Sequence, residues 1–153
     1  MLYCLDCEFN GFGGELISLA LSGEVDELYL CRPDAELEAL ELHPWVEEHV
    51  LPVLALRTAQ PVTLPLQDFG RAVQAFLTNG RDPCVVADWP EDLMHLMQCL
   101  IISPGQMVRI PDLSLKLMQV SAWPTDLGGA VQHNALWDAR ALRRALTLIR
   151  GEV

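Results

Sequence analysis

Two acidic residues, Asp6 and Glu8, stand two positions apart in the N-terminal segment LYCLDCEFNG. If residues 2–8 form a β-strand, both carboxylates point to the same face, because alternate side chains of a strand share a face. Two carboxylates held this close repel each other and favour protons or cations. Hard oxygen ligands of this kind suit Mg²⁺ or Mn²⁺. The alternative is that both acids simply reach solvent at an exposed strand edge.

The same segment carries two thiols, Cys4 and Cys7, which offer a second kind of metal ligand. In a strand these two residues face opposite sides, so a chelating thiol pair would need a turn. The apolar neighbours favour a strand instead. We therefore expect Cys7 to face away from the acids and Cys4 to be buried behind them.

A second acidic segment, VVADWPEDL, contains Asp88 directly after an apolar strand and Asp92 in the first turn of a helix that opens at Pro90. In α/β sheets, ligands gather at such strand ends. Each acid also has a purely structural interpretation. Asp92 suits the positive end of the helix dipole, and Asp88 can act as a helix cap.

A third segment, QHNALWDAR, contains His133 just before a helix that Asn134 can cap, and Asp138 within the first turns of that helix. Histidine titrates near neutral pH and is a common general base. Taken alone, a histidine before a helix is more often incidental. The hypothesis of a site therefore depends on the combination of all three segments.

Several elements must position these residues. Residues 2–6, 15–21 and 25–30 are predicted to form an antiparallel meander, because only the short linkers NGFGG and SGE separate them. PCVVA and QMVRI predict two further strands. Helices are expected after Pro44, over 66–77, from Pro90 and over the final NALWDARALRRALTLIR. The pattern predicts an α/β fold in one domain, residues 1–153, with a mixed five-stranded sheet flanked by helices.

The composition narrows the function classes. Hydrophobic residues make up 51% of the 153-residue chain, and the formal net charge is -11. Twelve of the 21 acids precede residue 51, against Arg32 alone, so no basic footprint for coating a polyanion is present. This charge distribution is still compatible with an enzyme that binds only the short end of a nucleic acid. Five cysteines without framework spacing, and no signal peptide or membrane span in the pattern, lead us to expect a reduced, cytoplasmic protein.

The three segments together resemble the DEDDh 3′-to-5′ exonucleases of the ribonuclease T and oligoribonuclease type, within the ribonuclease H-like superfamily. The first motif, D-x-E-x-x-G, is similar to Asp6 through Gly11, and the third, H-x4-D, to His133 through Asp138. The second motif is an apolar strand, commonly an Asn, and an Asp four residues later. Here Asp88 takes the Asn position and Asp92 that of the Asp. More narrowly, the segments are similar to a compact bacterial exoribonuclease-like branch.

The resemblance implies a ribonuclease H-like fold and phosphodiester hydrolysis with two divalent ions, Mg²⁺ or Mn²⁺. Asp6 would reach both ions, Glu8 and Asp138 the ion on the nucleophile side, and Asp92 the other, with Asp88 as its substitute. His133 would be the general base. Residues implied to hold the terminal nucleotide are Phe9, Asn10, Gly11 and Trp89. Single-stranded RNA is favoured over DNA as substrate, and a homodimer is compatible with the resemblance.

Three alternatives stay open at this point. The first is a 3′-to-5′ exonuclease acting on DNA, because the same carboxylates cleave both polymers. The second is a catalytically inactive domain whose acidic N-terminal third binds a basic partner, which predicts no metal dependence. The third is a metal-dependent phosphatase on another fold, for which the only lysine, Lys116, lies in no recognisable motif.

Overall fold

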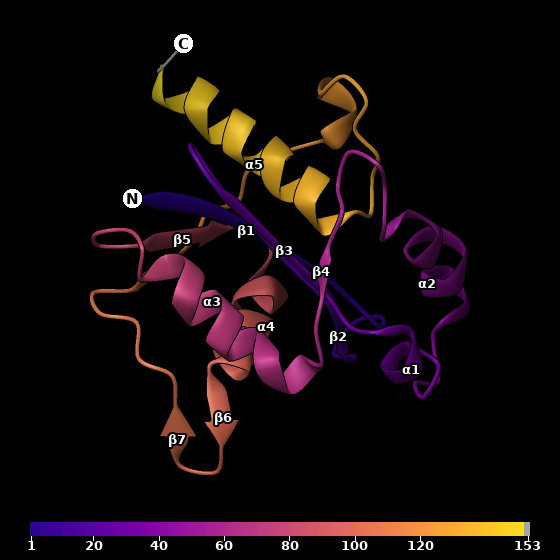
Figure 1. Ribbon diagram of the computed structural model, residues 1–153. Helices are drawn as coiled ribbons and strands as arrows, with labels where there is room; N and C mark the ends of the chain where they lie inside the picture. Colours follow the sequence, from indigo (N-terminus) through magenta and orange to yellow (C-terminus); the bar gives the residue numbers. More distant parts are fainter. Residues whose placement is uncertain (152–153) are drawn as a thin grey trace.

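A six-stranded mixed sheet forms the centre of the computed structural model, which describes residues 1–151 (Figure 1). Its first three strands are the predicted antiparallel meander: β1 (Leu2–Phe9), β2 (Leu16–Gly23) and β3 (Glu27–Cys31). β5 (Cys84–Ala87), the predicted PCVVA strand, then pairs in parallel with β1. This parallel pairing places the end of β5 beside the middle of β1.

The prediction of five strands is wrong in two respects. The strand order is β4-β3-β2-β1-β5-β8, so β4 (Val62–Thr63) and β8 (Ser114–Leu117) are the edge strands. Both are short and largely exposed, and neither was predicted, although leucines alternate with polar residues in β8. The predicted QMVRI strand supplies only β7 (Gln106–Met107), which pairs with β6 (Ile101–Ser103) in a separate two-stranded sheet. Its apolar residues Val108 and Ile110 are instead buried in the core.

Helices cover both faces of the sheet (Figure 1). One face packs against α3 (Phe69–Leu77), preceded by η2 (Leu66–Asp68), and against α4 (Pro90–Cys99). The opposite face packs against α5 (Ala135–Arg150). β1 contributes alternate side chains to the two sides: Cys7 lies in the core under α3 and α4, whereas Cys4 packs against α5. The expected opposite orientation of the two thiols is therefore confirmed.

The remaining helices lie beside one end of the sheet, where their apolar residues pack against Ile17 and Cys31. They are α1 (Asp34–Leu37), α2 (Pro44–His49) and η1 (Leu51–Val53). A short helix before α5, η3 (Pro124–Asp126), contacts α5 instead. As predicted, α2 begins at Pro44 and ends before Pro52. Within residues 1–151, no helix combines the length and the apolar character that crossing a bilayer requires.

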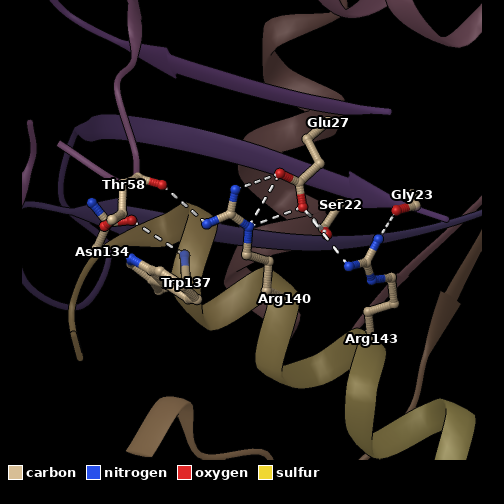
Figure 2. A network of polar contacts seen from close by, with 8 residues as sticks. All are labelled: Ser22, Gly23, Glu27, Thr58, Asn134, Trp137, Arg140 and Arg143. Carbon is tan, nitrogen blue, oxygen red and sulfur yellow. Dashed lines mark hydrogen bonds and ion pairs between the residues drawn. The ribbon is translucent and has the colours of Figure 1, made fainter. Parts of the chain in front are cut away.

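α5 is fixed to the sheet by its cap and by two arginines (Figure 2). Asn134 caps the helix as predicted, since its side-chain oxygen accepts a hydrogen bond from the backbone N–H of Trp137. Arg140 donates to both carboxylate oxygens of Glu27 on β3, with a closest distance of 2.6 Å. Arg143 donates to the backbone oxygen of Gly23. Both arginines therefore have structural partners on the β2–β3 hairpin, in agreement with a structural role for this face of the helix.

The sequence predicts an apolar stripe on this helix, and most of it faces the sheet. Its members are Leu136, Ala139, Leu142, Ala145, Leu146 and Ile149. The buried members are Leu136, Ala139, Leu142 and Leu146, all at most 5% exposed. Ala145 is half-buried, and Ile149 is 64% exposed near the end of the helix. The buried stripe sets the rotation of α5 about its axis and so determines which helix residues face β1.

Candidate active site

Three of the predicted metal ligands lie together where β1 meets α5. Ligand oxygens of Asp6, Glu8 and Asp138 all lie within 4.8 Å of one another. The two residues of β1 share the face that α5 covers, and Asp138 lies in the first turn of that helix. All three side chains are half-buried. Carboxylates more than 125 residues apart in the chain are thus held by rigid elements in one small volume.

Asp92, at the start of α4, is not one of the acids whose oxygens lie within 4.8 Å of one another, but its charge acts on Asp6 and Glu8. It is 2% exposed, and its Oδ2 atom is buried with no hydrogen-bond partner among the described residues. The thiol of Cys7 contacts the backbone oxygen of Asp92 at 3.8 Å, which ties the helix start to β1. A buried oxygen without a partner is costly, unless a cation or a proton satisfies it.

The charges of these acids act mainly on one another. Burial raises the pKa of Asp6 well above its ordinary value, and Asp92, Asp138 and Glu8 raise it further. Burial, then Asp138 and Asp92, raises the pKa of Glu8 in the same way. Burial is also the first cause for Asp92, whose pKa rises to about 8, with Asp88 next. The pKa of Asp138 rises to about 7, although hydrogen bonds from the backbone of His133 and Asn134 oppose the rise.

Asp88 lies at the end of β5 and is half-buried. Burial raises its own pKa, and its charge raises the pKa of Asp6, Asp92 and Asp138. Asp88 is therefore a fifth acid near the cluster. Asp92 differs from it in being almost fully buried with an unsatisfied oxygen. That difference favours Asp92 over Asp88 as the ligand from the second segment.

The donor set fits hard divalent cations. Each candidate ligand is a carboxylate oxygen, which Mg²⁺ and Mn²⁺ prefer to the softer nitrogen and sulfur ligands. Cys7 faces the opposite side of β1, and Cys4, on the same side as Asp6, is not part of the ligand group. When no cation is bound, the raised pKa values favour protonation of some of these carboxyl groups near neutral pH, which lowers the repulsion between them.

His133 adjoins the cluster through its backbone, which hydrogen-bonds the carboxylate of Asp138. It adopts a left-handed conformation, with φ of 63°, immediately before the cap residue Asn134. Its imidazole lies edge-on to Trp45, with ring centroids 4.7 Å apart, and 6.4 Å from His49. Burial lowers the pKa of His133, and the charge of His49 lowers it further. A neutral imidazole of this kind can accept a proton at neutral pH.

The residues expected to bind the terminal nucleotide differ in how many contacts they already make within the protein. The ring of Phe9 packs against His95 at 4.9 Å, and the side-chain amide of Asn10 hydrogen-bonds Glu15, the backbone oxygen of Glu41 and the backbone N–H of His43. Asn10 therefore braces the β1–β2 loop. Gly11 has φ of 73°, which glycine adopts without strain. Contacts of these residues with a substrate stay predictions.

Trp89 is the most accessible of the predicted substrate residues, at 47% exposed. Its ring lies 6.2 Å from that of Phe12, which is 86% exposed at the tip of the β1–β2 loop. Glu91 joins the two segments, because its carboxylate accepts hydrogen bonds from the indole N–H of Trp89 and the backbone N–H of Gly13. Glu91 thus holds two exposed aromatic rings together at the start of α4, next to Asp92 in the sequence.

Sequence reasoning did not identify Glu91, Trp45 or His49 as parts of this region. The spacing of Trp45 and His49, four residues apart after Pro44, could have indicated that they share one face of a helix. Nothing in the pattern indicated that this face would meet His133. An acid in the first turn of a helix is favoured by the helix dipole, so the position of Glu91 did not indicate that it would contact the β1–β2 loop.

Comparison with known proteins adds no relative. No model of a known protein family matches the chain, and no curated protein matches it. The class of the molecule is therefore given by its fold and its site: a mixed α/β sheet flanked by helices, with a half-buried carboxylate cluster where β1 meets α5 and the buried Asp92 at the start of α4.

Proposed function

We propose that this protein is a metal-dependent 3′-to-5′ exonuclease with a ribonuclease H-like fold, acting on single-stranded RNA in preference to DNA. The observation that carries the proposal is the cluster of Asp6, Glu8 and Asp138 oxygens within 4.8 Å, with the unsatisfied oxygen of Asp92 buried near it. The preference for RNA and the direction of cleavage derive from the resemblance of the three motifs to the DEDDh exonucleases.

The topology supports the ribonuclease H-like part of the proposal. An antiparallel three-stranded meander is continued by two parallel strands, β5 and β8, and helices cover both faces. The four acids of the motifs come from the first strand, from the helix after β5 and from the last helix. This order along the chain agrees with the resemblance.

The residues divide the chemical work as follows. Asp6, Glu8, Asp92 and Asp138 would hold two divalent cations. When bound, these ions supply positive charge that stabilises the attacking and leaving oxygens of an in-line phosphodiester displacement. His133, neutral because burial lowers its pKa, accepts the proton of the attacking water. Phe12 and Trp89 offer exposed rings on which bases can stack without regard to sequence.

The test is a cleavage assay with 5′-labelled single-stranded RNA and DNA of equal sequence, in Mg²⁺, Mn²⁺ or chelator. We expect a ladder that shortens from the 3′ end in either metal, none in chelator, and faster loss of RNA. A 3′-phosphate on the RNA should block the reaction at its start. A faster loss of DNA would favour the DNA exonuclease alternative.

Two variants make the assay specific to the proposed site. Asp138→Asn removes one ligand and should abolish the ladder, whereas Asp34→Asn, an exposed acid on α1, is the matched control and should leave it unchanged. If purified protein shortens neither polymer in either metal, or if Asp138→Asn cleaves as well as Asp34→Asn, the proposal is wrong.

A further inference from the structure

His133 needs a support beyond its own helix, because it precedes α5 and lies in no regular element. Its backbone is fixed from one side. Asn134, the next residue, is fully buried and donates to the backbone oxygen of Val53 at 2.7 Å and to the hydroxyl of Tyr29 at 3.3 Å. These contacts place the Cα of His133 near η1 and β3. They do not fix the rotation of its imidazole.

The imidazole meets a pair of stacked rings on α2. Trp45 and His49 lie face to face, with centroids 4.7 Å apart and an interplanar angle of 11°. His133 contacts the same Trp45 ring at 4.7 Å and at 81° to it, so the indole touches both imidazoles. Figure 1 shows α2 on the side of the molecule where α5 begins, which brings these two parts of the chain together.

Local contacts make this pair a rigid support. The backbone N–H of Trp45 donates to Nδ1 of His43, the cap of α2, and Nδ1 of His49 lies 3.0 Å from the backbone oxygen of Trp45. Val46, between them, is 1% exposed and anchors the helix in the core. Trp45 itself is 43% exposed, so burying apolar surface does not explain its position. Its most specific contacts are with the two histidines.

We propose that Trp45 and His49 are positioning residues, which hold the imidazole of His133 in the orientation needed to accept a proton from the attacking water. The assignment rests on the proposed nuclease function. It differs from a role in stacking a base, because Trp45 would then act on substrate binding and not through His133. The two roles predict different kinetics.

The decisive experiment is a double-mutant cycle on single-stranded RNA in Mn²⁺, with Trp45→Ala, His133→Ala and both together. Trp45→Ala should lower kcat about 10-fold to 100-fold, part of what a general base contributes, and leave KM unchanged. In the His133→Ala background the same change should alter kcat less than about twofold, because residues that act through one another are not additive. Trp45→Phe should restore most of the activity.

Two controls separate positioning from loss of structure. Trp123→Ala removes another exposed tryptophan, at 60% exposure, and should leave kcat and KM unchanged. The thermal midpoint of Trp45→Ala should remain near that of Trp123→Ala. The positioning role is wrong if Trp45→Ala lowers kcat by the same factor in the His133→Ala background as in wild type. It is also wrong if Trp45→Ala raises KM and leaves kcat unchanged, because Trp45 then contacts the substrate.

A second readout needs no nuclease activity. The ring-carbon protons of His133, assigned in NMR spectra with His133→Gln, lie beside the indole and should carry a ring-current shift. Trp45→Ala should remove that shift, and His49→Ala should change it by loosening the stack. Unchanged His133 resonances in both variants would overturn the positioning role even in an active enzyme. If the shifts are lost but the protein has no nuclease activity, Trp45 and His49 do orient the His133 ring, and the proposed nuclease function is wrong.

Discussion

Replacing Asp92 by asparagine should stabilise the metal-free protein at neutral pH and abolish its proposed activity. The carboxyl is 2% exposed, has an oxygen without a partner among the described residues, and lies near Asp6 and Asp138. Asparagine keeps the shape of the side chain and removes the charge. We therefore expect the ionised Asp92 to destabilise the metal-free folded protein and to be required for the proposed activity.

The magnitude follows from the pKa of Asp92, which burial raises from 3.8 to about 8. Between these two pH values the native protein holds a proton that the unfolded chain has lost. Stability therefore falls as the pH rises, by roughly 1.4 kcal/mol for each pH unit. The full span corresponds to on the order of 5 kcal/mol for this carboxyl, which is a large share of the roughly 5–15 kcal/mol that stabilises a typical domain.

Calorimetric scans in chelator at pH 5, 6, 7 and 8 measure this effect. For the wild-type chain we expect the thermal midpoint to fall by on the order of 10 °C across this range, because about 2–4 °C corresponds to 1 kcal/mol in a domain of this size. Asp92→Asn should show a smaller fall and melt higher than wild type at pH 8. Added Mn²⁺ should raise the wild-type midpoint at pH 8 by mass action and affect Asp92→Asn less.

Asp34→Asn is the matched control, because it removes the same charge from an exposed position on α1. It should follow the wild-type curve in chelator and in Mn²⁺. A wild-type midpoint that stays level or rises between pH 5 and pH 8 in chelator would refute the reasoning. So would an Asp92→Asn variant that melts like Asp34→Asn at every pH.

Four further outcomes are expected. Asp6→Asn should slow cleavage at least about 100-fold and, like Asp92→Asn, raise the midpoint of the metal-free protein in scanning calorimetry, because it removes a buried charge. Asp88→Asn should keep cleavage within about tenfold of wild type, whereas Asp92→Asn should lose it, in rates measured side by side. His133→Ala should lower kcat by about 10²-fold to 10⁴-fold and leave the Mn²⁺ affinity, measured by titration calorimetry, unchanged. Arg140→Met should lower the free energy of unfolding in urea by about 2 kcal/mol, because Glu27 loses its paired hydrogen bonds.

The sequence allowed prediction of the elements with strong periodicity. The meander was predictable because short apolar segments were separated by short glycine-containing turns, and α5 because its apolar stripe followed a capping residue. The edge strands β4 and β8 were not predicted. Their pairing depends on backbone groups of β3 and β5 that are far away in the sequence, and their own side chains are largely exposed.

The candidate ligands could be predicted as a set, but their relative burial could not. The choice between Asp88 and Asp92 shows why. Both follow the same strand and both have structural interpretations, so only the resemblance to the DEDDh exonucleases favoured Asp92. The difference arises from the packing of α4 against β1, which buries Asp92 almost completely and leaves Asp88 half-buried. The contact of α2 with His133 could not be predicted either, because it depends on packing between residues about 90 positions apart in the sequence.

The strongest contacts of α5 lie on either side of the acid that it contributes to the cluster. Asp138 meets Asp6 and Glu8, whose charges would push the helix away from β1 when no cation is bound. Asn134, one turn before Asp138, is fully buried and hydrogen-bonded to η1 and β3. Arg140, two residues after it, is paired with Glu27. These flanking contacts oppose the repulsion locally, so a change that weakens either one should be most damaging in metal-free protein at high pH, where the carboxylates are ionised.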